Sequence, residues 1–453
     1  MTDNTIHRRT FLGTATLAPL VAIAGCLGND DETDDSVEPL PEFLEVENPP
    51  DAVYVPTHHE TMRMYNPIET GEIAVAPMLS YPHPFWTVAG TGPEATEREE
   101  PEESRGVHMM FTVWHPETGV VLPTDEGTQV RITKDGESVG SPRSLWPMIS
   151  QEMGFHVGDN VTLPEDGTYT VELELSSLSV ERTGGLEEVL TDRQHVTFEF
   201  TYDNEFREQV VNVEFLDEEF WGARGALEPM DHAHHADGEH DDHHDSHGHD
   251  GHSDGHGHDD HHDSDDHNGH GDDHHNDSNE HGDHNGHTDD HHSDGDEHGD
   301  HGAIPYSALP EADEYPGRGL VVPGEESVPT DHQDLPRSGD AAIVATLLDA
   351  DHRLADGGEY LLVSPRTPYN RVPLADMSIH VECTRDGETI DEGPLTQTLD
   401  GEVALHYGRS VPPLEPGDTV TITIESPPQV ARHQGYETAF LAMDPVELQV
   451  PPR

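Results

Sequence analysis

A 70-residue segment near the middle of the chain contains almost nothing from which a hydrophobic core could form. Residues 232–301 hold 24 His and 23 Asp or Glu, with no Lys or Arg. A segment without apolar periodicity cannot offset the conformational entropy that folding removes. We therefore expect this histidine–aspartate tract to be disordered without metal. It divides the 453-residue chain into two halves, each of which needs an apolar core.

The composition of the tract predicts binding of transition metals. Imidazole nitrogens are good ligands for Zn, Cu, Ni and Fe(II), and neighbouring carboxylates make them more basic. Because the spacings allow many alternative chelates, we expect high capacity and low selectivity, and release of metal when the imidazoles are protonated. The alternative is a soluble spacer. The clearest paired ligands are His234, His235, His243, His244, His261, His262, His274, His275, His291 and His292.

Acidic residues dominate the whole sequence, which has 94 Asp or Glu against 21 Lys or Arg. The formal net charge is −73, and Lys134 is the single lysine. Phosphate binding needs clustered cations, so this balance argues against nucleic acid as a partner. Concentrated salt screens the self-repulsion of such a charge. We therefore interpret the composition as that of a protein from a halophilic prokaryote.

The first 26 residues have the pattern of an export signal. Arg8 and Arg9 precede a Phe-Leu pair, as in twin-arginine signals, and the apolar run that follows is too short to cross a bilayer. The run ends in Ile-Ala-Gly-Cys, which resembles a lipobox with Cys26 as the lipidated residue. We predict a lipid anchor on the outer face of the cytoplasmic membrane, with 27–52 as an acidic tether. Cys383 then has no disulfide partner within the chain.

Short stretches of alternating apolar and polar residues lie on both sides of the tract, between turns rich in Gly, Asp and Pro. This spacing is typical of antiparallel β-sandwiches. We predict an all-β protein with two Ig-like sandwich domains, at 53–228 and 304–453, joined by a disordered linker at 229–303. The predicted strands are 107–114, 129–133, 168–175, 195–202, 341–348, 359–363, 377–383 and 419–425.

The two halves share a local pattern that indicates duplication. His156 and His406 each begin the sequence His-x-Gly-x-x-Val, and each is followed eleven residues later by a turn glycine. A Pro-Met pair ends at Met148, shortly before Gly-Phe-His-Val-Gly around His156. In the second half, Arg-His-Gln-Gly-Tyr-Glu-Thr begins at Arg432.

These motifs resemble the bacterial periplasmic iron-transport family, small Ig-like proteins that bind copper or iron and support ferrous-iron uptake. The resemblance implies a site of His and Met side chains near a dimer interface. The alternative is that these side chains only pack or cap strands. As ligands it implies His108, Met148, His156, His406 and His433, with His83, His115, His352 and His380 as weaker candidates.

Each half carries a complementary part of the motif set. The first half lacks the terminal Arg-His loop and has 179–183 in its place, and the second half lacks the Met, with Thr398 nearby. We therefore hypothesise that the halves pair as an intramolecular pseudo-dimer that shares one composite site. A dimer of two chains is the alternative.

The sequence thus predicts an exported, lipid-anchored protein that captures iron or copper for a metal permease, with Zn or Ni possible in the tract. Metal buffering or detoxification is a second interpretation, and an envelope scaffold with incidental metal binding is a third. We expect no enzymatic activity. The sequence contains no His-Glu-x-x-His and no phosphate-binding glycine loop.

Overall fold

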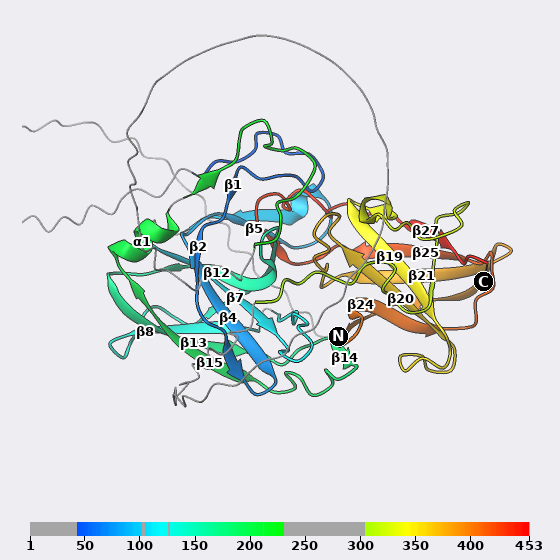
Figure 1. Cartoon of the computed structure of the whole chain (residues 1–453), viewed down its shortest axis with the longest axis horizontal. Coiled ribbons are helices and arrows are strands. Elements are labelled where there is room, and N and C mark those ends of the chain that lie inside the picture. The colour runs from blue at the N-terminus through cyan, green and yellow to red at the C-terminus, as the bar shows by residue number, and fades with distance from the viewer. Residues whose placement is uncertain (1–42, 102–104, 126, 212, 231–303, 453) are drawn as a thin grey trace, which may run out of the picture. The chain divides into compact units, whose positions relative to one another are not determined.

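The computed structural model describes residues 43–101, 105–125, 127–211, 213–230 and 304–452 (Figure 1). Arg8, Arg9, Cys26 and the histidine–aspartate tract lie outside these residues. The described part consists mainly of β-strands and connecting loops, so the predicted all-β class is confirmed. The α-helix in it, α1 (Asn204–Val210), is short, and no described helix is long and apolar enough to cross a membrane. The described residues all belong to one compact unit.

The first half of the chain supplies most of two antiparallel sheets, whose edges and order position the site described below. In chain order its strands are β1 (His58–His59), β2 (Met62–Met64), β3 (Ile68–Thr70), β4 (Ile73–Ser80), β5 (Phe85–Val88), β6 (Thr96–Glu99), β7 (Gly106–Trp114), β8 (Gln129–Lys134), β9 (Glu137–Ser138), β10 (Arg143–Ser144), β11 (Trp146–Ser150), β12 (Gly154–Thr162), β13 (Gly167–Leu175), β14 (Glu181–Thr183), β15 (Gln194–Tyr202) and β16 (Glu214–Phe215), with a 3-10 turn at Pro93–Ala95.

The second half supplies the remaining strands and a second pair of sheets. Cys383 is buried there in the apolar core. In chain order the strands are β17 (Arg318–Gly319), β18 (Arg337–Ser338), β19 (Ala341–Leu348), β20 (Glu359–Arg366), β21 (Ser378–Arg385), β22 (Glu388–Pro394), β23 (Thr396–Asp400), β24 (Ala404–Val411), β25 (Thr419–Ser426), β26 (Ala431–Arg432) and β27 (Val446–Gln449), with a 3-10 turn at His332–Asp334.

Two sheets form the first sandwich. The larger has the order β2-β4-β7-β12-β11-β26-β5-β6, with β3 paired to β4, and the smaller has the order β10-β8-β13-β15, with β9 paired to β8. Phe111 on β7 and Phe198 on β15 meet edge to face between them, with ring centroids 5.8 Å apart. The second sandwich consists of β14-β23-β24-β20-β19-β17, with β18 paired to β19, and of β22-β21-β25-β27.

The two halves exchange one short strand each. Strand β26, from the second half, pairs in parallel with β11 of the first, and Ala431 lies opposite Met148. Strand β14, from the first half, pairs in parallel with β23 of the second, and Glu181 lies opposite Thr398. The exchange is reciprocal, so neither of the two large sheets is complete without a segment from the other half.

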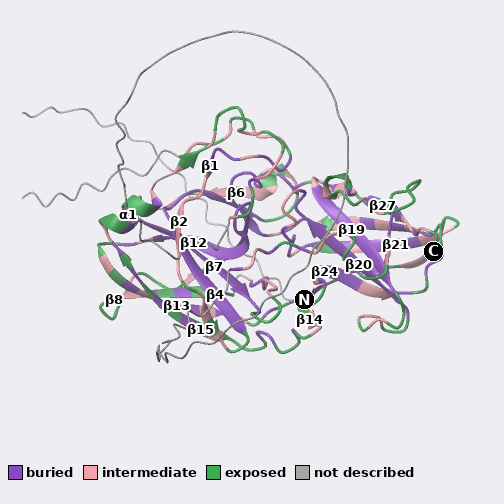
Figure 2. Cartoon of the chain, in the orientation of Figure 1, coloured by how far each residue is buried: buried purple, intermediate pink, exposed green. Residues whose placement is uncertain are grey.

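Strands β4, β7 and β12 of the first sandwich are buried on both faces (Figure 2). An antiparallel sheet with one face in water shows alternating burial, as β15 does here. One face of the larger sheet carries apolar side chains such as Val75 and Phe111 that pack in the sandwich core. The other, which we call the outer face, is covered by other segments of the chain. Phe43 stacks on His83, and Ile304 packs on Ala74.

Candidate metal centre

Histidine and methionine side chains meet on the outer face of the first sandwich. Directly opposed residues of antiparallel strands share a face. His108 on β7 opposes Asn160 on β12, and His156, four residues before Asn160, opposes Met148 on β11. His108, His156 and Met148 therefore lie on the same face, although the nearest two are eight positions apart in the sequence. The strand register explains why the spacing His-x-Gly-x-x-Val places His156 there.

The exchanged strand β26 brings His433 into the same group. The backbone N–H of His433 donates to the carbonyl of Ile149 at 3.1 Å. The preceding Arg432 is fully buried, and its guanidinium donates to the backbone carbonyls of Pro428, Tyr436 and Ala439. Arg432 thus closes the 428–439 loop around itself and fixes the point at which His433 leaves the strand. Burial lowers the pKa of Arg432 to about 9.

His83 enters the group from the connection between β4 and β5. Its backbone N–H donates to the Asn160 amide oxygen at 3.3 Å, and its carbonyl accepts from the Asn160 amide nitrogen at 2.8 Å. The rings of His83 and His108 have centroids 4.2 Å apart, and those of His83 and His433 are 5.1 Å apart. The ring of His156 lies 5.0 Å from that of His433. We call His83, His108, His156 and His433 the four-histidine cluster.

Each ring in the cluster has its Nδ1 beside an oxygen that can only accept a hydrogen bond. This contact places the ring proton on Nδ1 and leaves Nε2 with a free lone pair, which is the arrangement of metal-ligating histidines. The Nε2 atoms of His156 and His433 lie 3.2 Å apart, and those of His83 and His108 are buried without a hydrogen-bond partner. The acceptors are Pro84 O for His83 (3.0 Å), Asn160 Oδ1 for His108 (3.1 Å), Gly154 O for His156 (3.2 Å) and a Glu60 carboxylate oxygen for His433.

The cluster is uncharged at neutral pH because burial disfavours the imidazolium form. Burial lowers the pKa of His83 to about 4 and that of His433 to about 3. It lowers the pKa of His108 and of His156 well below the ordinary value, and repulsion from neighbouring histidines adds to the effect. Four neutral imidazoles whose Nε2 lone pairs are buried form a set of ligands that a transition metal ion would satisfy.

Two groups of three residues, which share His433, each have possible ligand atoms close enough together to hold one ion. The possible ligand atoms of His108, His156 and His433 lie within 4.8 Å of one another, and so do those of Glu60, His83 and His433. The second Glu60 oxygen is buried without a hydrogen-bond partner. Glu60 could therefore act either as a carboxylate ligand or as the group that orients His433. It also supplies negative charge to a site that would hold a cation.

A small pocket connects the cluster to the cover of the outer face. It has a volume of about 20 Å³, and Phe43, His58, Glu60, His83 and His433 are among its lining residues. A volume of this size holds about one water molecule. It excludes any organic substrate but has room for a single ion. Beside it, burial raises the pKa of Glu152, which also accepts a hydrogen bond from His59 at 2.7 Å.

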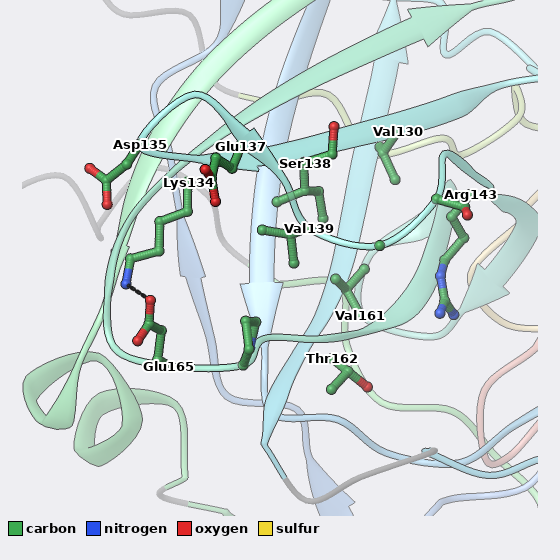
Figure 3. A pocket seen from close by; sticks show the side chains of 14 residues that line it. Val130, Lys134, Asp135, Glu137, Ser138, Val139, Arg143, Val161, Thr162 and Glu165 are labelled. Carbon is green, nitrogen blue, oxygen red and sulfur yellow. Dashed lines mark hydrogen bonds and ion pairs between the residues drawn. The ribbon is translucent and has the colours of Figure 1, made fainter.

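A larger cavity in the first sandwich is unrelated to the cluster. It has a volume of about 580 Å³ and lies between the β8–β9 hairpin and the end of β12 (Figure 3). Lys134 and Glu165 form an ion pair of 2.7 Å at its edge. None of the four histidines lines it.

The structure thus brings His108, Met148, His156 and His433 together, and it adds His83, one of the weaker candidates predicted above. It places the other predicted ligands elsewhere. His406 lies in the second sandwich, and His380 lies on β21 of its smaller sheet. His115 contacts the Thr118 hydroxyl at 3.0 Å, and His352 accepts from the backbone N–H of Leu354.

Strand registers explain why the second half has no equivalent cluster among its described residues. His406 corresponds to His156, but Tyr360 stands at the position of His108, and its hydroxyl lies 3.2 Å from the His406 Nε2. Thr398 takes the place of Met148, and Thr183 on the exchanged strand takes that of His433.

An ion pair fills the space next to these residues in the second half. Asp400 is fully buried and accepts two hydrogen bonds from Arg353, at 2.5 and 2.7 Å. The Thr183 hydroxyl donates to the same carboxylate at 2.6 Å. The second half therefore has a buried ion pair between Arg353 and Asp400 where the first half has imidazoles with free Nε2 lone pairs.

Sequence reasoning did not identify Glu60 or Asn160. Asn160 lies within the His-x-Gly-x-x-Val motif that begins at His156, and only the strand register shows that its amide holds both His83 and His108. Glu60 follows His58 and His59, and this acidic neighbour of two histidines was the one available signal.

Fold and site together define an all-β protein with a buried histidine cluster of metal-ligand geometry. A family described as a domain of unknown function (DUF7350) matches residues 326–449. A comparison with curated proteins gives no match. Among solved structures, the chain is similar to a copper-bound variant of FetP from uropathogenic Escherichia coli strain F11, with 15% identity over 31% of this chain and 97% of that one, and a TM-score of 0.23. FetP of the same strain, as isolated after expression in the periplasm of E. coli, matches with 15% identity over 31% and 96%, and a TM-score of 0.21.

Proposed function

We propose that this chain binds one transition metal ion in the four-histidine cluster and captures it outside the cell for uptake. The observation that carries the proposal is the convergence of four neutral imidazoles whose Nδ1 atoms are each held by an acceptor. Bound water molecules alone would not explain why four imidazoles with unprotonated Nε2 atoms meet in one buried place. The metal is the cargo of the protein, and the 20 Å³ pocket supports an ion as the sole occupant.

Copper and iron are the ions that the donor set favours. Imidazole binds Cu, Fe(II) and Zn, and the thioether of Met148, opposite His156, adds preference for Cu(I). A carboxylate, Glu60, is available if Fe(II) is the cargo. A comparison of the affinities for Cu(I) and Fe(II) under reducing conditions decides which of the two ions is carried.

We also propose one site per chain, shared by the two halves. His433 comes from the second half and the other three histidines come from the first. At the corresponding place the second half has Tyr360, Thr398 and Thr183. The chain would then act alone as an intramolecular pseudo-dimer.

The test is a competition titration of the full chain with Cu(I), Fe(II), Zn and Ni against a chelator strong enough to suppress weak binding by the tract. His433→Ala should abolish the tight site. His406→Ala, which removes the corresponding buried histidine of the second half, should keep it. Equal loss in both variants, or in neither, would contradict a site in the first sandwich.

A buffering or detoxification role predicts a different result in cells. If the cluster serves uptake, cells that carry His433→Ala accumulate less metal at limiting supply and survive excess metal as the wild type does. If the protein is a buffer, the variant is sensitive to excess and accumulates normally at limiting supply.

Export and anchoring are part of the proposal and rest on the sequence pattern at Arg8, Arg9 and Cys26. Cys26→Ala should release the protein from the membrane fraction, and Arg8→Lys with Arg9→Lys should retain it inside the cell. A membrane-bound Cys26→Ala protein would exclude lipid at this residue as the anchor.

A further inference from the structure

We propose that Met62, Met64, Met78, Met110 and Met153 form a thioether site for a soft monovalent cation, Cu(I), distinct from the four-histidine cluster. These five side chains pack as one cluster that contains no other hydrophobic residue type. The sequence has 11 methionines, so nearly half of them gather here. Met78, Met110 and Met153 are buried, and Met62 and Met64 are partly exposed.

The strand register arranges three of these residues in a row. Met64 on β2 opposes Met78 on β4, and Met78 opposes Met110 on β7. Directly opposed side chains share a face and lie within contact distance. The row therefore crosses three strands on the outer face, from the edge strand β2 towards the interior. Met62 begins a parallel row that continues through Ser80 to His108.

The methionine row reaches the metal centre at Gly158. A Cβ atom at this glycine would lie 3.2 Å from the Met110 Cγ and 3.2 Å from the Met148 Sδ. A side chain there would press against both methionines. The glycine lets the side chain of Met110 approach that of Met148, which opposes His156. Thioethers therefore extend from partly exposed Met62 and Met64 to Met110 beside Gly158, and Met148, which packs with Phe85 and Ala431, also lies beside this glycine.

Packing alone does not explain the choice of residue type. The inner face of the same strands is filled by the ordinary core side chains Val75, Leu79, Phe111 and Val157, and Met109 lies among them. Leucine has nearly the volume of methionine and fills such space equally well. On the outer face every member of the cluster is instead a thioether, a soft ligand that selects Cu(I).

The inference goes beyond the proposed function because it does not need the histidines. A cation held by thioethers alone is bound without displacement of protons, and it lies between partly exposed side chains and the buried centre. We infer that Cu(I) enters through this site, whereas Zn(II), a harder ion that thioethers bind poorly, does not.

The test uses the full chain with methyl-¹³C methionine, in which each methyl resonance reports one residue, and Cu(I) buffered by bicinchoninate. The methyl resonances of Met78, Met110 and Met153 should shift as Cu(I) is added and stay in place with Zn(II). Met78→Leu with Met110→Leu should lower the number of tightly held Cu(I) ions by one per chain. Met109→Leu, on the inner face of the same strand, should leave it unchanged.

The edge pair provides a second variant that disturbs the buried packing less. Met62→Leu with Met64→Leu should slow Cu(I) transfer into the chain at least tenfold. The proposal is overturned if the Met78, Met110 and Met153 methyl groups do not shift at Cu(I) concentrations that saturate the chain. If the histidine centre alone is wrong, these methyl groups still shift, and His433→Ala leaves the amount of bound Cu(I) unchanged.

Discussion

His156 and His433 are separated by 277 positions in the sequence, and their Nε2 atoms lie 3.2 Å apart. One stands on β12 of the first half, and the other follows β26 of the second. The contact therefore exists only when both halves are folded and the strand exchange is complete. Metal binding at this place therefore depends on the association of the two halves as well as on the ligands.

This relationship predicts the behaviour of the separated halves. Residues 43–230 and 304–453, expressed alone, should each lack the tight metal site, because the first has no His433 and the second has none of the other three histidines. Mixing the two should restore it, and a chelator-competition titration measures the recovery. Wild-type affinity in either fragment alone would contradict a shared site.

Asn160 should control metal affinity without being a ligand. Its amide holds His108 through Nδ1 and His83 through the backbone, so Asn160→Ala leaves all four imidazoles present but less well oriented. Loss of such a supporting group costs about 10- to 100-fold in metal affinity. Ser410→Ala, at the corresponding position of the second half, is the control and should bind as the wild type does.

Arg432 should be needed for both stability and metal binding. Arg432→Ala leaves the buried carbonyls of Pro428, Tyr436 and Ala439 without their donor. We expect a loss of about 3 kcal/mol in the free energy of unfolding, measured by urea denaturation, together with loss of the tight site. Arg182, on the exchanged strand β14, makes a matching contact to the carbonyls of Val189 and Leu190. Arg182→Ala should also destabilise the protein, but it should keep the metal affinity of the folded form. Equal metal loss in both variants would show that global unfolding is the cause.

The metal-free protein should become less stable as the pH falls below about 6.5. His83, His406 and His433 have pKa values lowered by burial to about 4, 4 and 3, so they stay neutral in the folded state while the unfolded chain takes up protons. Each such histidine lowers the free energy of unfolding by about 1.4 kcal/mol per pH unit between the two pKa values.

Urea unfolding at pH 7, 6 and 5 measures this slope. The raised pKa of Glu152 and that of Glu437 act in the opposite direction, but only near and above pH 4.5, where the unfolded carboxyl groups lose their protons. His406→Gln should reduce the slope by about one histidine. An unchanged slope in His406→Gln would show that this buried histidine takes up its proton in the folded state as it does in the unfolded chain.

The sequence was most informative where a local pattern determines the structure. Period-two alternation predicted strands at 168–175 and 195–202, and the structure has β13 and β15 there, each with alternating buried and more exposed side chains. The motif around His156 and the Arg-His pair at Arg432 pointed to residues that the structure places in one cluster. The complementary gaps of the two halves led to the hypothesis of a composite site, and His433 does lie beside His156.

Long-range pairing was beyond what local pattern could predict. Strands β14 and β26 have three and two residues, too few for any periodicity, so their exchange left no signal in the sequence. His83 lies in a connection, where strand spacing gives no guidance. His406 carries the same motif as His156, and only the partner strand reveals that Tyr360 occupies the place of a ligand.

The described residues on either side of the histidine–aspartate tract both contact the first sandwich. The backbone N–H of Met230 donates to the carbonyl of Glu152 at 3.0 Å, and Ile304 packs on Ala74, Ala76 and Trp114. The chain therefore leaves and rejoins the same sandwich on the two sides of the tract, so the contacts between the two halves do not require a tract of one particular length. Doubling the length of such a loop costs only about 0.6 kcal/mol. Insertions and deletions in this repetitive segment should thus accumulate freely among related chains, while the spacing from Met148 to Gly158 stays fixed.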